Sequence, residues 1–257
     1  QRPHLALPKA FVAALRAPAW IPVRQTPLHP SLPWPSSSSS SRAALPLVLP
    51  PCQTRPQADM WQCSLRKGIA ETDVSSPLLR QALGWEDVID PITLAHQLLG
   101  LSAALQGGRG GNFRQILNKC VPEIYTALQE QLVLGEEENE PETPPTSSMM
   151  PTTPRTGRRS PIPRLRPGLE AVPGILAGGA WIWVADEFLP TTRVAFSAPL
   201  NSRPYLVQVS LELVDAYAPL LRLLGVRESF TPRDLAKALE TMYHSAGLRT
   251  PLSVADL

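Results

Sequence analysis

The chain has 257 residues, of which 30 are proline and 43% are hydrophobic, and its 24 basic and 22 acidic residues leave a formal net charge of +2. This balance excludes a strongly basic nucleic-acid-binding protein and an acidic tail protein, so we expect no nucleic-acid partner. A chain of this length can bury a sizeable core. Because proline is more than twice as frequent as in an average protein, much of it must lie outside that core.

Composition divides the chain into five zones. They are residues 1–23, which end a preceding α/β unit; 24–56, a linker rich in Pro and Ser; 57–134, a helical segment; 135–168, a charged and proline-rich linker; and 169–257, an α/β unit truncated at its C-terminal end. The second linker cannot bury enough apolar surface to offset the entropy lost on ordering it, so we expect it to be disordered.

Capping residues and prolines mark the helices between the two linkers. Ser76 and Pro77 begin a short helix that Gly84 ends, and Asp90 with Pro91 begins the next. Apolar residues then recur at helical spacing over residues 113–132. We expect Pro122 to break this run into two helices, because proline removes an intrahelical hydrogen bond.

Short apolar runs characterise the last zone. Residues 181–184, 193–196 and 205–209 predict three strands, since they are rich in β-branched and aromatic side chains. A helix is expected over 211–224, bent at Pro219 and ended by Gly225. Another begins at Thr231 and Pro232, where the residues match a capping box.

Two sequence patterns occur twice in the same order. Residues 19–23 match residues 180–184 at four of five positions. In the second pattern, a Leu-Gly pair is followed by a proline that begins a predicted helix, and a leucine stands three positions after that proline. The pattern occurs at residues 83–94 and again at residues 224–235. This repetition predicts a mixed α/β (α+β) fold built from tandem helix–strand units with short buried strands, interrupted by the linkers.

The chain lacks the usual signatures of catalytic and metal sites. It contains no phosphate-binding loop, nucleophile elbow or HExxH motif. The cysteines have no CxxC spacing and are expected to be reduced thiols, and the histidines are dispersed; these residues are Cys52, Cys63, Cys120, His4, His29, His96 and His244. The sequence therefore predicts a non-enzymatic protein with no catalytic, cofactor-binding or metal site and no cofactor.

Asp186 and Glu187 are the best catalytic candidates, since they follow a predicted buried strand. Carboxylates at a strand end can act as acid and base where burial separates their pKa values. This leaves a hydrolase as one alternative. The competing interpretation is a polar turn that ends the strand, because adjacent residues of an extended segment point to opposite faces.

The linkers offer a further alternative. Prolines at residues 144, 145 and 161–167 can form extended polyproline stretches, so the chain can be an adaptor that recruits partners. The arginine-rich run at 155–166 is expected to be a solvated linker, although it can contact phosphates non-specifically. Ser160 within it resembles a kinase site.

The chain shows no membrane segment. A membrane-spanning helix needs about 20 apolar residues, and the longest apolar run, 171–185, has 15 and contains Pro173. The chain begins at Gln1, and a helix-capping pattern at Ser253 and Asp256 lies at its very end. We therefore expect a fragment of a longer polypeptide.

Several ordered motifs carry a family resemblance. They are RPQ at 55–57 with WQCS at 61–64, residues 79–85 followed by LAHQLL at 94–99, CVPEIY at 120–125, and WIWVADEF at 181–188 followed by VAF at 194–196, PYL at 204–206 and LGVRESF at 224–230. Together they resemble the sacsin family of very large chaperone-related proteins, its plant and algal homologues in particular. The family pattern has glycines where this chain has Ala185 and Glu187.

The resemblance implies a piece of one sacsin repeat, downstream of the chaperone-type ATPase module. The Glu-x-x-x-Asn helix and Asp-x-Gly-x-Gly turn of that module are missing from this sequence, so no family catalytic residue carries over. The implied function is that of a non-catalytic scaffold segment of a chaperone or co-chaperone in protein folding and quality control. Its implied partners are client proteins or other chaperones, and its implied location is the cytoplasm.

Overall fold

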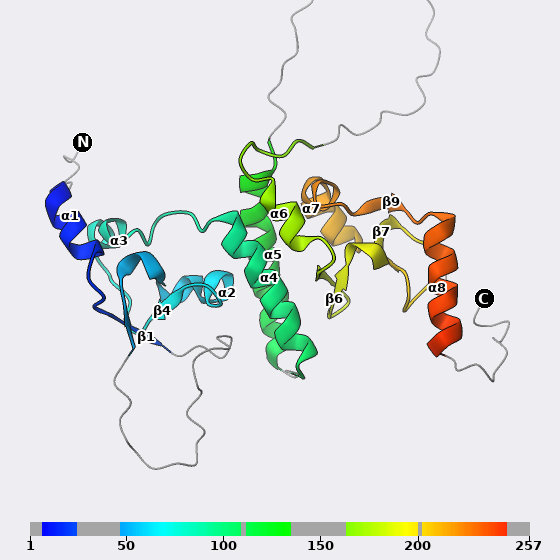
Figure 1. The fold of residues 1–257 in the computed structure, drawn as a ribbon, viewed down its shortest axis with the longest axis horizontal. Coiled ribbons are helices and arrows are strands. Elements are labelled where there is room, and N and C mark those ends of the chain that lie inside the picture. The colour runs from blue at the N-terminus through cyan, green and yellow to red at the C-terminus, as the bar shows by residue number, and fades with distance from the viewer. Residues whose placement is uncertain (1–6, 25–46, 109–111, 135–162, 200–201, 246–257) are drawn as a thin grey trace, which may run out of the picture.

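A computed structural model describes residues 7–24, 47–108, 112–134, 163–199 and 202–245. These residues form eight α-helices and three sheets, which confirms the predicted mixed α/β class. The molecule is elongated, with α1 (Lys9–Arg16) and α8 (Pro232–Ser245) at opposite ends and the long helices α4 (Pro91–Gln106) and α5 (Asn112–Leu132) crossing its middle (Figure 1). None of the described helices is long and apolar enough to span a membrane.

The first sheet has the strand order β2-β1-β4-β3. Its strands are β1 (Ile21–Arg24), β2 (Val48–Leu49), β3 (Thr54–Arg55) and β4 (Gly68–Ala70). The linker predicted over residues 24–56 is therefore wrong at its C-terminal end, where β2 and β3 form. The apolar run at 47–49 lies between two prolines. Because edge strands tolerate proline, this run joins the sheet as its edge strand, β2. The serine run at 36–41 lies outside the described residues.

The helix starts predicted before the long helices are confirmed. Ser76 Oγ accepts a hydrogen bond from Leu79 N (3.4 Å) at the start of α3 (Pro77–Leu83), and Gly84 ends that helix at a φ of 75°. Asp90 Oδ1 accepts one from Thr93 N (2.8 Å) at the start of α4. A short helix, α2 (Met60–Cys63), precedes them.

Pro122 does not divide the run over 113–132, so that prediction is wrong. Helix α5 is continuous, with Pro122 inside it. The proline costs about 3 kcal/mol. Its neighbours Cys120, Val121, Ile124 and Tyr125 are all buried, and each fully buried large apolar side chain returns about 1.5–3 kcal/mol. Tertiary packing therefore outweighs the lost intrahelical hydrogen bond.

The C-terminal part contains the three predicted strands and two that the sequence did not indicate. Its elements are α6 (Ala171–Leu176), β5 (Ala180–Val184), β6 (Glu187–Pro190), β7 (Val194–Ser197), β8 (Val207–Gln208), α7 (Leu211–Leu223) and β9 (Arg227–Ser229). Strands β5 and β6 form an antiparallel hairpin, and β7 pairs in parallel with β8 and β9. Helix α7 kinks at Tyr217, two residues before Pro219.

The repeated sequence patterns correspond to repeated structure. A helix, two antiparallel strands, a 3-10 turn and a third strand follow one another as α1-β1-β2-η1-β3 and again as α6-β5-β6-η3-β7, where η1 is Pro51–Gln53 and η3 is Thr191–Arg193. Later in each unit a helix ends near a glycine with positive φ, Gly84 or Gly225, before a proline-initiated helix. We call α1 to α4 the first unit and α6 to α8 the second; α5 lies between them.

Tyr125 joins α5 to the second unit. Its side chain is fully buried, and its hydroxyl donates to Trp181 O (2.7 Å) and accepts from Trp183 N (2.9 Å). Its ring lies edge-on to Trp181, with the centroids 6.1 Å apart, and to Tyr217, at 5.4 Å. Burial raises the pKa of the phenol. One neutral hydroxyl therefore satisfies two backbone groups of β5.

Replacing Tyr125 by Phe should lower the free energy of unfolding by about 1–3 kcal/mol, because the buried Trp183 N–H loses its acceptor. Urea unfolding measures the change. Tyr217→Phe is the matched control: its hydroxyl donates to Pro122 O (3.0 Å) at a half-buried position, where water can replace it. Equal losses in the two variants would contradict the role given to Tyr125.

Candidate protein-binding groove

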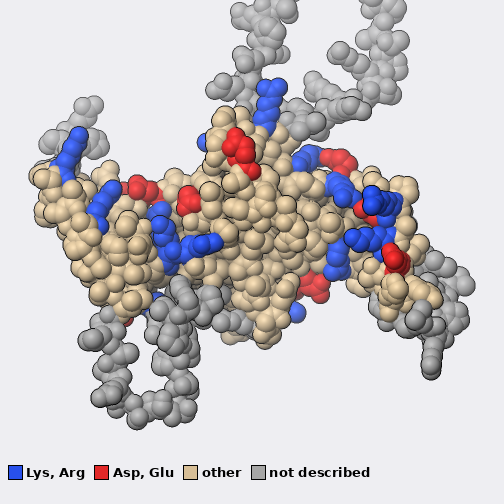
Figure 2. Space-filling model, in the orientation of Figure 1, with Lys and Arg blue, Asp and Glu red and all other residues tan. Residues whose placement is uncertain are grey.

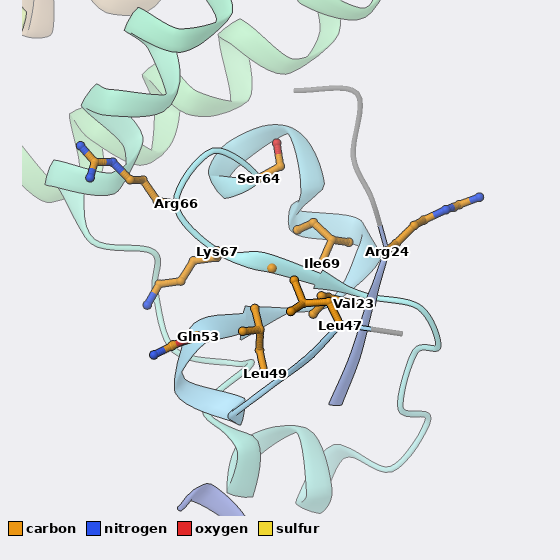
Figure 3. A pocket seen from close by; sticks show the side chains of 10 residues that line it. Val23, Arg24, Leu47, Leu49, Gln53, Ser64, Arg66, Lys67 and Ile69 are labelled. Carbon is orange, nitrogen blue, oxygen red and sulfur yellow. The ribbon is translucent and has the colours of Figure 1, made fainter. Parts of the chain in front are cut away.

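An apolar groove opens beside the sheet of the first unit (Figure 3). Its volume is about 250 Å³, and its apolar lining residues are Val23, Leu47, Leu49, Gly68 and Ile69. They come from β1, from β2 with the residue before it, and from β4, which the strand pairing brings side by side. Leu47 is 43% exposed at the mouth of the groove.

Gly68 sets the depth of this groove. A Cβ atom there would lie 2.6 Å from Leu49 Cδ1 and 2.8 Å from Val23 Cγ1, closer than real Cβ contacts. Any larger residue at this position would displace the side chains that form the floor. Glycine at position 68 therefore leaves room for the Leu49 and Val23 side chains in their present positions.

The rim of the groove is basic. Arg24 lies on one side of the apolar residues, and Arg66 and Lys67 lie on the other (Figure 3). No acidic side chain lines the groove within the part of the chain that the structure describes. Lys67 Nζ donates to Cys52 O (2.9 Å), which fixes its side chain against the turn at η1. The groove therefore combines apolar walls with an electropositive edge.

A buried amide fixes the turn that carries the basic residues. Gln97 on α4 is fully buried; its Oε1 accepts from Leu65 N (3.0 Å), and its Nε2 donates to Ser64 Oγ (3.3 Å). Since a buried amide without partners is costly, these bonds hold the 64–67 turn against α4. The sequence analysis did not single out Gln97. The feature that could have identified it is a polar residue placed beside the apolar stripe of α4.

A buried arginine supports the opposite edge of the sheet. Arg55 on β3 donates to Trp85 O (3.2 Å) and Asp87 O (2.6 Å), and its guanidinium lies 3.6 Å from Asp59. Burial raises the pKa of Asp59 although Arg55 lowers it. These contacts connect β3 to the segment between α3 and α4.

Asp186 and Glu187 do not form an acid–base pair in the structure. Ala185 and Asp186 occupy the tight turn between β5 and β6 with φ values of 51° and 63°, and Glu187 begins β6. Both carboxylates are exposed, and Asp186 Oδ1 accepts from Asn118 Nδ2 (3.4 Å). The geometry is that of the polar turn, with Ala185 in a conformation that favours glycine.

The other candidate residues from the sequence analysis do not come together at one site in the described part of the structure. Within the described ranges, no three His, Cys, Asp or Glu side chains gather in a way that could hold a metal ion. His96 lies on α4, where burial lowers its pKa, and His244 lies at the end of α8. Outside the described residues lie His4, His29, Pro144, Pro145, Ser160 and most of the basic run at 155–166.

Comparison of the chain with known protein families, with curated proteins and with solved structures finds no match. The likeness to the sacsin family therefore rests on the motifs quoted above.

The cysteines should differ sharply in reactivity. Cys63 and Cys120 are buried, and burial raises the pKa of each thiol to about 12, whereas Cys52 is exposed. The thiolate is the reactive form, so the native protein at pH 8 should release one equivalent of thionitrobenzoate from Ellman's reagent and the unfolded protein three. Cys52→Ser should abolish the native reaction; rapid modification of a second thiol in the native state would contradict this burial.

Proposed function

We propose that the chain is a non-catalytic scaffold segment of a sacsin-like chaperone or co-chaperone, acting in protein folding and quality control. It binds apolar segments of client proteins or of other chaperones in the groove of the first unit. The observation that carries the proposal is the apolar groove with a basic rim and no acidic lining residue among those described. By analogy with the sacsin family, the proposed location of the chain is the cytoplasm.

The size of the groove favours a peptide side chain over a cofactor. Ligand pockets for small molecules usually enclose about 300–1,000 Å³, and this groove encloses about 250 Å³ and is open to solvent. It therefore has room for one or two apolar side chains of a longer segment. Arg24, Arg66 and Lys67 would attract acidic residues that flank them.

The edge strand β2 supplies a second means of recognition. It pairs with β1 on one side and, among the strands that the structure describes, is the last of the sheet on the other. Leu47 and Val48 expose apolar surface along this edge. An extended segment of a partner can pair with such an edge while its alternate side chains enter the groove.

The other functions considered have less support. The hydrolase alternative would need Asp186 and Glu187 to share a site, but both are exposed, Asp186 in the turn and Glu187 at the start of β6. The adaptor alternative falls largely on linker residues outside the described part of the chain. We therefore give neither as the proposed function.

The groove can be tested with a fluorescent nonapeptide that carries Leu-Val-Leu between aspartates. Fluorescence anisotropy should show binding that weakens with salt, and a peptide with lysines in place of the aspartates should bind more weakly. Leu47→Asp should weaken binding at least about tenfold, because burying a leucine contributes about 1.5–3 kcal/mol. The matched control is Val88→Asp, at a position that is 73% exposed outside the groove.

Two results would count against this function. Equal affinity of the Leu47→Asp variant and the wild type would remove the groove as the binding site. Failure of the wild-type chain to slow the aggregation of a heat-unfolded client protein, measured by light scattering, would contradict the chaperone role of this segment.

A further inference from the structure

A second cleft, of about 280 Å³, lies beside the groove in the first unit. Lys67 lines both, and the end of α1, η1, β3 and the segment that joins α3 to α4 form the rest of the second one, which we call the α1–β3 cleft. On the face that Figure 2 shows, Lys and Arg side chains lie over α2 and α3, with Asp and Glu side chains beside them. The charged residues that line the cleft are Arg16, Arg55, Lys67, Asp87 and Asp90.

Backbone carbonyls hold two of the basic side chains of this cleft. Arg16 Nε donates to Ala82 O (2.6 Å) and its Nη2 donates to Gln81 O (3.1 Å), near the end of α3. Lys67 is held in the same way by its bond to Cys52 O. Because a carbonyl oxygen carries no formal charge, these bonds fix the position of the two cations and leave their charge uncompensated. Both cations are therefore preorganised for an anion.

Arg55 is only 8% exposed and still has unused donors. Its bonds to Trp85 O and Asp87 O and its contact with Asp59 are all made by Nη1. No residue of the described ranges accepts a hydrogen bond from its Nε or Nη2. Trp181 Nε1 is the one enclosed side-chain nitrogen without a partner among the described residues. The free nitrogens of Arg55 are therefore open to solvent, and the open space beside this residue is the cleft that it lines.

The free nitrogens of Arg55 suit a carboxylate. Nε–H and one N–H of Nη2 point in parallel from one edge of the planar guanidinium, and this edge matches the two oxygens of a carboxylate. The acidic residues of the cleft leave the edge free. Asp90 accepts from Thr93 N and from Thr93 Oγ1 (2.5 Å) at the start of α4. Burial raises the pKa of Asp90, but the bonds from Thr93 and the charge of Lys67 outweigh burial and lower the pKa below its usual value.

Charge and size limit the ligand to a small monoanion. Three basic and two acidic side chains leave the cleft with a formal charge of +1, which one carboxylate neutralises and a phosphate dianion exceeds. The apolar part of the lining is formed by Pro51, Leu83 and Ile89, which are all buried. The volume of about 280 Å³ lies just below the usual range of pockets for drug-sized ligands. A carboxylic acid with a short apolar body fits these limits.

We propose that the α1–β3 cleft binds a small carboxylic acid with an apolar body, whose carboxylate accepts two parallel hydrogen bonds from Arg55 Nε and Nη2. Arg16 and Lys67 add fixed positive charge, and the apolar body packs against Leu83 and Ile89. This site is distinct from the peptide groove, and it binds its ligand whether or not the groove binds a client.

Isothermal titration calorimetry of the full chain with N-acetyl-leucine tests the proposal, and N-acetyl-leucinamide is the matched neutral probe. The acid should bind at least about tenfold more tightly than the amide, because only the acid accepts hydrogen bonds between charged groups. Saturating acid should also slow the alkylation of Cys52 by iodoacetamide, since that exposed thiol lines the cleft. The amide at the same concentration should slow it less.

Three variants locate the site. Arg55→Lys keeps the charge and removes the parallel donors, so it should weaken binding of the acid at least about tenfold. Arg16→Met should weaken it about threefold to tenfold, because an exposed charge contributes less than a buried one. Arg114→Met is the matched control, since Arg114 is an exposed residue of α5 that lines neither cavity, and it should bind the acid as the wild type does.

Circular dichroism should show that the variants keep the native fold. If Arg55→Lys does not fold, Arg16→Met and the protection of Cys52 still decide the question. Equal affinity of the wild type for the acid and the amide would overturn the proposal. So would unchanged affinity in a folded Arg55→Lys or Arg16→Met variant, or alkylation of Cys52 that the acid does not slow.

Discussion

The hydroxyl of Tyr125 is the contact on which the middle of the molecule depends. It satisfies a carbonyl and an amide of β5 at once, so α5 is fixed to the first strand of the second unit. Trp181 then lies against the Tyr125 ring and the second unit's hairpin is held against the central helices. The same burial explains why α5 continues through Pro122, since breaking the helix there would separate Tyr125 from its partners.

The proposed function depends on a surface that packing leaves open. In the first unit, the contacts of Gln97 hold the 64–67 turn so that basic side chains border an apolar groove. An apolar groove with a basic border suits a scaffold that binds other chains.

Much of the local structure could be predicted because its signals are local. Ser76, Asp90 and the prolines that follow them begin helices through contacts within four residues. The repeated Trp-Ile pattern marks the first strand of each unit. Strand β2 could not be predicted in this way, since its two residues form a strand only when β1 pairs with them. The groove could not be predicted for the same reason, because Val23, Leu49 and Ile69 meet only through strand pairing between segments that are distant in the sequence.

The central claim is that the Tyr125 hydroxyl fixes α5 to β5. Hydrogen–deuterium exchange of the Tyr125→Phe variant beside the wild type tests it most directly. In the variant, amides of residues 180–184 should exchange faster than in the wild type, because the Trp183 N–H has lost its acceptor, while amides of residues 21–24 in the first unit should exchange as before. Unchanged exchange over residues 180–184 would contradict the claim.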